Sequence, residues 1–102
     1  MIYNKLVRDR IPEIIEGQGG KADIRILEPE EYTHYLEQKL DEEVGEYHKE
    51  RNLEELADIL EVVYALAENL GATKDALLEI YQSKHDSRGG FSKKIFLISK
   101  EG

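Results

Sequence analysis

The sequence contains no cysteine and no tryptophan, and it has only two prolines and no long hydrophobic run. Without cysteine, the chain can form neither disulfides nor thiolate metal sites. No apolar stretch is long enough for the core of a signal peptide or for a membrane span. We therefore expect a soluble, cytoplasmic protein that does not associate with membranes.

Basic residues are also few relative to acidic ones: the chain has 14 basic and 22 acidic residues, and its formal net charge is −8. Duplex DNA and anionic membrane surfaces are repelled by such a chain, so no nucleic acid polymer is expected as a partner. A small nucleotide would need a metal cation to bridge the like charges. The length of 102 residues suits a single domain, 1–102.

Three segments show the 3.6-residue apolar periodicity of amphipathic helices: 30–50, 53–70 and 74–88. Asn52 and Thr73 are suitable N-caps for the second and third of these helices. Before them, residues 1–20 combine a basic arm with a short helix at about 12–16, because proline is well tolerated in a first helical turn. The pattern predicts an all-α fold, an antiparallel helical bundle.

Two shorter segments, 22–28 and 93–99, have the composition of β-strands. In the first, Ile24 and Ile26 alternate with charged neighbours. The two segments can pair into a small two-stranded ribbon, which needs packing against helices to be stable. We therefore expect such a ribbon as an addition to the bundle.

The helix predicted at 53–70 is apolar over roughly half of its circumference. Such a helix needs partners on two sides, and three helices of a small chain hardly supply them. We expect a homodimer or homotetramer in which this helix lies at or beside the subunit interface.

Acidic residues at helical spacing form two pairs, E-x-x-E at Glu43 and Glu46 and E-x-x-D at Glu55 and Asp58. On a helical wheel Glu43 falls within the apolar stripe and Glu46 lies at its edge. The short connection predicts antiparallel neighbours, so the four carboxylates converge at similar height. Four like charges in a partly desolvated groove require cations or protons, and ligation by oxygen alone favours Mg²⁺ or Mn²⁺.

Each acidic residue also has a simpler interpretation. Asn52-x-x-Glu55 matches a capping box, and Glu46 is placed to form a surface ion pair with Lys49. Glu61, one turn beyond Asp58, is either an extra ligand or a surface acid. None of these alternatives accounts for the inward direction of Glu43.

The same motifs, EVGE at 43–46 and ELAD at 55–58, resemble the all-α, MazG-like nucleoside triphosphate pyrophosphohydrolases. NKLVRDRIPEII near the start and KHDSRGGF near the end resemble a small house-cleaning branch of that superfamily. The resemblance implies an oligomeric helical bundle with Mg²⁺ held by the four acidic residues. It also implies hydrolysis of a standard or non-standard nucleoside triphosphate to the monophosphate and pyrophosphate.

In such a mechanism Glu43 and Glu46 are the candidate catalytic residues, and Glu46 is the candidate for orienting or deprotonating the attacking water. Basic residues from two parts of the chain are candidates for binding the substrate phosphates: Lys5, Arg8, Lys84 and Arg88. The alternative for the pair on the third helix is a solvated cationic helix end, which the helix dipole favours.

Two other functions fit parts of the pattern. Phosphoribosyl-ATP pyrophosphohydrolase shares the expected chemistry, and a non-catalytic helical dimerisation module would use the acids only for solubility. The arm at 1–20 and the RGGF sequence favour the house-cleaning enzyme by resemblance.

Overall fold

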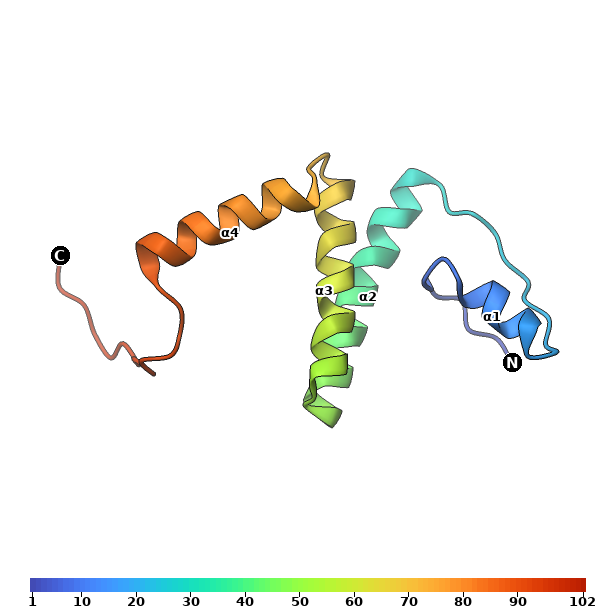
Figure 1. The fold of residues 1–102 in the computed structure, drawn as a ribbon, viewed down its shortest axis with the longest axis horizontal. Coiled ribbons are helices and arrows are strands. Elements are labelled where there is room, and N and C mark those ends of the chain that lie inside the picture. The colour runs from blue at the N-terminus through green and yellow to red at the C-terminus, as the bar shows by residue number, and fades with distance from the viewer.

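Four helices joined by turns and extended segments make up the chain, and no strand forms (Figure 1). The computed structural model describes all 102 residues. The helices follow one another as α1 (Ile11–Gly17), α2 (Pro29–Glu50), α3 (Leu53–Asn69) and α4 (Lys74–Arg88). The expected all-α class is confirmed, and each boundary lies within one residue of the predicted one. None of the helices combines the length and hydropathy that crossing a bilayer requires.

The prediction of a two-stranded ribbon from 22–28 and 93–99 is wrong. Both segments lack strand structure, and they lie at opposite ends of a molecule that measures 60 × 32 × 22 Å (Figure 1). The first leads directly into α2, while the second follows α4, which points away from the rest of the chain. A strand needs a partner for its backbone groups, and the path of the chain keeps these two segments apart.

The antiparallel pair of α2 and α3 is formed by a turn of two residues. Arg51 adopts a left-handed conformation, with φ of 48°, and its N–H donates to the carbonyl of Tyr47 to close α2. Asn52 then caps α3 by accepting a hydrogen bond from the N–H of Glu55 at 3.0 Å. At the other end of the pair, the Asn69 side chain donates to the Thr33 hydroxyl at 2.9 Å. The expected antiparallel hairpin is therefore present.

Few side chains are buried within one chain. Only Leu36, Val62 and Ala67 are buried, and the radius of gyration is 18.0 Å. A compact domain of this length has a radius of gyration of about 13 Å. Leu53 and Leu70, at the two ends of the broad apolar surface of α3, are 82% and 86% exposed. One chain thus covers only part of the surface that its sequence makes apolar.

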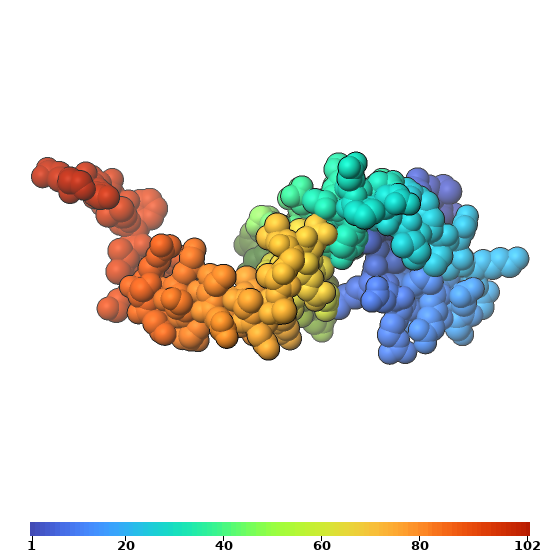
Figure 2. Space-filling view, turned by 90° about the horizontal axis from the view of Figure 1, so that it is seen from above, coloured from blue at the N-terminus to red at the C-terminus, as the bar shows by residue number.

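The last helix, α4, begins after Gly71, which has φ of 89°, and is capped by the Thr73 hydroxyl, which accepts from the N–H of Ala76. It leads away from the α2–α3 pair, and residues 89–102 continue beyond it as an extended tail (Figure 1). Figure 2 shows α4 and the tail projecting on the side opposite to the N-terminal arm. The basic end of α4 therefore lies far from the N-terminal residues of the same chain.

The start of α2 is fixed by a capping box that sequence analysis did not identify. The Glu28 side chain accepts from the backbone of Glu31, and the Glu31 side chain accepts from the backbone N–H of Glu28 at 3.2 Å. Arg25 donates two hydrogen bonds to the same Glu31 carboxylate, at 3.0 and 2.7 Å. The hydrogen bonds from Arg25 and from Glu28 lower the pKa of Glu31 to about 2.

Glu31→Gln removes this ion pair while nearly preserving the shape of the side chain. Because the folded-state pKa lies below the ordinary value of 4.5, the pair stabilises the fold above that pH, and its contribution is lost as the pH falls toward 2. We expect a melting temperature a few degrees below that of the wild type at pH 7, with the difference shrinking below pH 4.5. Thermal unfolding followed by circular dichroism measures it.

Glu30→Gln is the matched control, since Glu30 lies in the same first turn and forms no ion pair. Equal melting temperatures for the two variants at pH 7 would contradict a stabilising role for the Arg25–Glu31 pair.

Candidate metal centre

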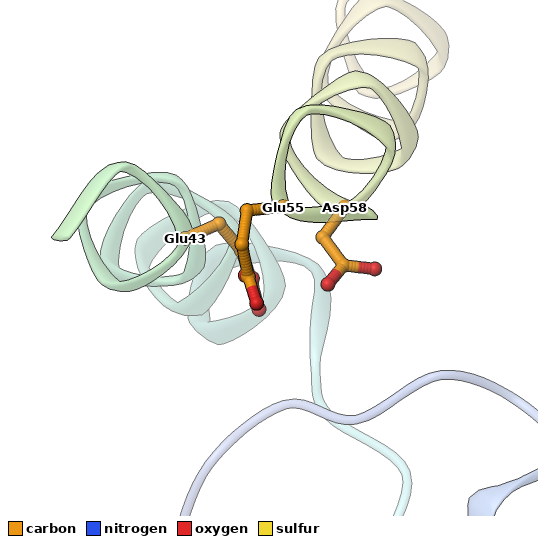
Figure 3. A group of neighbouring side chains, drawn as sticks. All are labelled: Glu43, Glu55 and Asp58. Carbon is orange, nitrogen blue, oxygen red and sulfur yellow. The ribbon is translucent and has the colours of Figure 1, made fainter. Parts of the chain in front are cut away.

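Three carboxylates from two helices come together near the turn of the α2–α3 pair. Glu43 on α2 and Glu55 and Asp58 on α3 each offer an oxygen, and the three atoms lie within 4.8 Å of one another (Figure 3). The inward position of Glu43 brings its side chain to only 12% exposure, whereas Asp58 is 40% exposed. The group is therefore closed on the α2 side and open to solvent on the α3 side.

The electrostatics of this group disfavour three negative charges. The pKa of Glu55 is raised, first by loss of hydration and then by repulsion from the charges of Asp58, Glu43 and Glu46. Like charges at this spacing are tolerated when a proton or a cation neutralises them. A proton or a bound cation would relieve this repulsion on Glu55.

The donor set fits a hard divalent cation. All three ligands are carboxylate oxygens, and no histidine or thiolate is part of the group. Mg²⁺ and Mn²⁺ prefer oxygen ligands, and Mg²⁺ typically keeps coordination positions for water or phosphate beside one or two carboxylates. Glu43, Glu55 and Asp58 are the residues that would hold such an ion.

Glu46, the fourth predicted ligand, lies outside the group of three. Its side chain is 44% exposed and forms an ion pair with Lys49 at 3.7 Å, the surface pairing that the sequence also allowed. The position at the edge of the apolar stripe explains this, because Glu46 is directed partly toward solvent. Glu46 still contributes to the repulsion on Glu55, so it borders the site.

The capping alternative for Glu55 holds only in part. Asn52 accepts from the backbone N–H of Glu55, but the Glu55 side chain makes no return hydrogen bond to the backbone of Asn52. Its carboxylate instead belongs to the group of three. The N-cap and the acidic site therefore use different atoms of the same residue.

Basic side chains of the same chain partly neutralise the acids. The Arg8 guanidinium donates to Asp58 at 2.7 Å and lies 3.6 Å from Glu61, so Glu61 is paired with the arm. Lys39 lies 3.4 Å from Glu43 and is only 18% exposed. Sequence analysis missed Lys39, although its spacing of four residues before Glu43 is the usual signal for a helical ion pair.

Lys5, the other predicted phosphate ligand of the arm, donates to Glu42 at 2.9 Å. This hydrogen bond, together with the charge of Glu42, raises the pKa of Lys5. Glu42 is adjacent in sequence to Glu43, so Lys5 and Arg8 fix the arm at two points along the acidic side of the α2–α3 pair.

Lys84 and Arg88 do not join this site. Both lie on α4, which leads away from the carboxylates (Figure 1). Arg88 instead lines a separate hollow of about 340 Å³ at the end of α4, together with Lys93 and Lys94 of the tail. Within one chain, Lys84 and Arg88 are therefore separated from Glu43, Glu55 and Asp58.

A groove of about 500 Å³ lies between the arm and the α2–α3 pair. Glu43, Asp58 and Arg8 line one part of it, and apolar side chains that include Leu36 and Val62 line its wall. Its volume is in the usual range for sites that bind small molecules. The three-carboxylate group thus borders a groove large enough for a ligand.

Comparison with known proteins gives one partial match. An uncharacterized protein of Mycolicibacterium smegmatis is 55% identical over 42 residues, which are 41% of this chain and 43% of that protein. No protein-family model and no solved structure matches the chain. The match spans less than half of either protein and assigns the chain to no family.

Mn²⁺ is expected to raise the melting temperature of the wild type, because an ion that binds only the folded state stabilises it by about 2.7 kcal/mol at one hundred times its dissociation constant. Glu43→Gln and Asp58→Asn should weaken Mn²⁺ binding about tenfold or more, since each removes one charged ligand. Thermal shift over a Mn²⁺ titration measures both effects.

Glu54→Gln is the control, because Glu54 lies in the first turn of α3 beside Glu55 but outside the group. Glu46→Gln should keep most of the Mn²⁺ effect. An unchanged melting temperature of the wild type in Mn²⁺ would support the non-catalytic module and argue against a metal centre.

Proposed function

We propose that the protein hydrolyses a nucleoside triphosphate to the monophosphate and pyrophosphate, with a divalent cation held by Glu43, Glu55 and Asp58. The observation that carries this proposal is the convergence of three carboxylates beside a groove that a basic arm borders. The resemblance of the EVGE and ELAD motifs to MazG-like pyrophosphohydrolases adds the reaction type. Phosphate chemistry fits the site because the acids bind metal and the nearby cations match phosphate charge.

Mg²⁺ bound to these acids would neutralise the charge of the phosphate oxygens around the bond that breaks. The residues of the chain would bind and orient the substrate around it. Glu43 and Asp58 come from different helices, so the rigid α2–α3 pair sets their separation. This placement of ligands on helices keeps the geometry fixed before substrate arrives.

Arg8 is the residue best placed to bind a phosphate. Its guanidinium now pairs with Asp58, and its planar fork matches a phosphate as well as it matches a carboxylate. With a cation held at Asp58, the Arg8 guanidinium would be free to bind a substrate phosphate. Lys39, beside Glu43, can make the same exchange from the other helix.

Glu46 remains the proposed residue that orients or deprotonates the attacking water. It borders Glu55 but does not belong to the group of three, so it keeps a carboxylate available for water. Its only ion pair is the exposed contact with Lys49 at 3.7 Å, which is a weak interaction. Metal binding and proton transfer would thus be divided between neighbouring acids.

We further propose that Lys84 and Arg88 contact phosphate in a homodimer or homotetramer, where α4 of one copy reaches the groove of another. The exposed leucines of α3 and the small number of buried residues support assembly. The distance of the C-terminal end of α4 from the α2–α3 pair of its own chain supports a contribution between copies.

Pyrophosphate release from a panel of natural and damaged nucleoside triphosphates, with phosphoribosyl-ATP included, tests the proposal directly. We expect turnover that requires Mg²⁺ or Mn²⁺. Glu43→Gln should lower kcat/KM about a hundredfold or more, because a ligand of the charge-neutralising ion is lost.

Glu54→Gln should retain wild-type activity and serves as the control for a change of one acidic residue on the same pair of helices. If no substrate releases pyrophosphate, or if Glu43→Gln is fully active, the proposed function is wrong. Preferential turnover of phosphoribosyl-ATP would assign the biosynthetic activity instead.

A further inference from the structure

The tail that follows α4 leaves large apolar side chains in contact with water. Both phenylalanines of the sequence lie in it, and Phe91 and Phe96 are 98% and 87% exposed. Ile95, Leu97 and Ile98 are exposed as well. The only backbone hydrogen bond that the tail makes after Gly89 joins the N–H of Lys94 to the carbonyl of Phe91. Apolar groups gathered in this way mark a surface that binds a partner.

The tail also differs in charge from the rest of the molecule. Residues 88–100 contain four basic residues and no acidic one, so the other ten basic residues and 22 acidic residues all lie elsewhere. None of these four cations forms an ion pair within the chain. More than half of the acids lie on α2 and α3, and the tail extends away from both helices of its own chain (Figure 1).

Helix α3 has a surface that matches the tail in both respects. Leu53, Leu56 and Leu60 are exposed and lie three and four residues apart, so they share one face, and the buried Val62 lies on the other side of the helix. The helix contains five acidic residues and no basic one. By contrast, α2 exposes no large apolar side chain, and α4 carries both charges. We call Leu53, Leu56 and Leu60 the leucine face.

The tail and α3 also agree in length. Residues 91–98 span roughly 27 Å when extended, and the 17 residues of α3 span roughly 26 Å. Two phenylalanines alone bury about 300–500 Å². In a two-fold dimer each copy gives one tail and receives another, which brings the buried area close to the roughly 800 Å² per partner of a stable interface.

We propose that residues 91–98 of one copy bind along the leucine face of α3 in a second copy, and that the exchange is reciprocal. Direct packing of α3 on α3 would bring together two helices that carry only negative charge, whereas the tail brings unpaired lysines. An anionic membrane would attract the tail but repel the remainder of the molecule, where acids outnumber bases by more than two to one.

This docking assumes neither a metal ion nor a reaction. It bears on the proposed function through Arg88, because only Gly89 and Gly90 separate that residue from the docked segment. The end of α4 is then held beside the acidic α3 of the second copy. The inference thus supplies a physical reason for α4 of one chain to approach the acids of another.

Crosslinking between copies tests the contact directly, because the chain has no cysteine of its own. Ala57→Cys adds a thiol beside the leucine face, and Ser92→Cys and Ser99→Cys add one near either end of the docked segment; all three keep the apolar side chains. Each tail variant is mixed with Ala57→Cys, incubated to allow exchange and treated with a short flexible thiol crosslinker. We expect at least one mixture to give heterodimers at several times the yield obtained with Glu37→Cys, an exposed change on α2.

Sedimentation of the full-length protein measures the strength of association. We expect a wild-type dimer that weakens as salt is added, and a dissociation constant about tenfold or more higher for Phe96→Ser and for Lys94→Glu. Lys21→Glu makes the same change of charge at an exposed position between α1 and α2 and should behave as the wild type. Circular dichroism should show unchanged helix content in all variants, because the tail lies outside the helices.

Four results would overturn the docking: a monomeric wild type, an unchanged dissociation constant in Phe96→Ser, no heterodimer above the Glu37→Cys level, or binding of the tail to phosphatidylserine vesicles without any effect of Phe96→Ser on association. Failure of the proposed reaction is distinguishable from these. A protein that releases no pyrophosphate but forms the crosslinked, tail-dependent dimer would refute the reaction and support the docking.

Discussion

Repulsion among three carboxylates within 4.8 Å is the constraint on which the rest of the structure depends. The α2–α3 pair brings Glu43, Glu55 and Asp58 together at one point, and the resulting charge has to be matched. Arg8 and Lys39 supply part of the matching charge. The contact of Arg8 with Asp58 also holds the arm beside the helix pair, and the groove forms between them. The acids thus set the negative charge of the site, and the Arg8–Asp58 pair helps to set one wall of the groove.

The helices were predictable because their ends depend on neighbouring residues. Asn52 caps α3 and Thr73 caps α4, because the side chain of each accepts a hydrogen bond from the backbone N–H three residues later. A capping residue immediately before an amphipathic segment can be read directly from the sequence. The inward direction of Glu43 was also predictable, because the 3.6-residue period of a helix places this residue within the apolar stripe of α2. The absence of the two-stranded ribbon was not predictable from the sequence. Segments 22–28 and 93–99 have the composition of strands, but whether they pair depends on the path of the whole chain.

Sequence patterns also did not predict the contacts that the N-terminal arm makes with α2 and α3. Arg8 meets Asp58 across fifty positions of sequence, and no local spacing reports such a contact. Glu46 shows a different limit, since periodicity placed it at the edge of the inward face, and its half-exposed side chain lies beside Lys49 rather than in the group of three. Periodicity gives the direction of a side chain to within part of a turn, whereas ligation requires its rotamer as well.

The position of Mn²⁺ in a crystal tests the central claim most directly, because anomalous scattering locates the ion without any assumption about activity. The account predicts a strong anomalous peak bounded by Glu43, Glu55 and Asp58, with the Arg8 guanidinium moved away from Asp58. No peak at saturating Mn²⁺, a peak elsewhere, or an intact Arg8–Asp58 pair beside the bound ion would contradict the account.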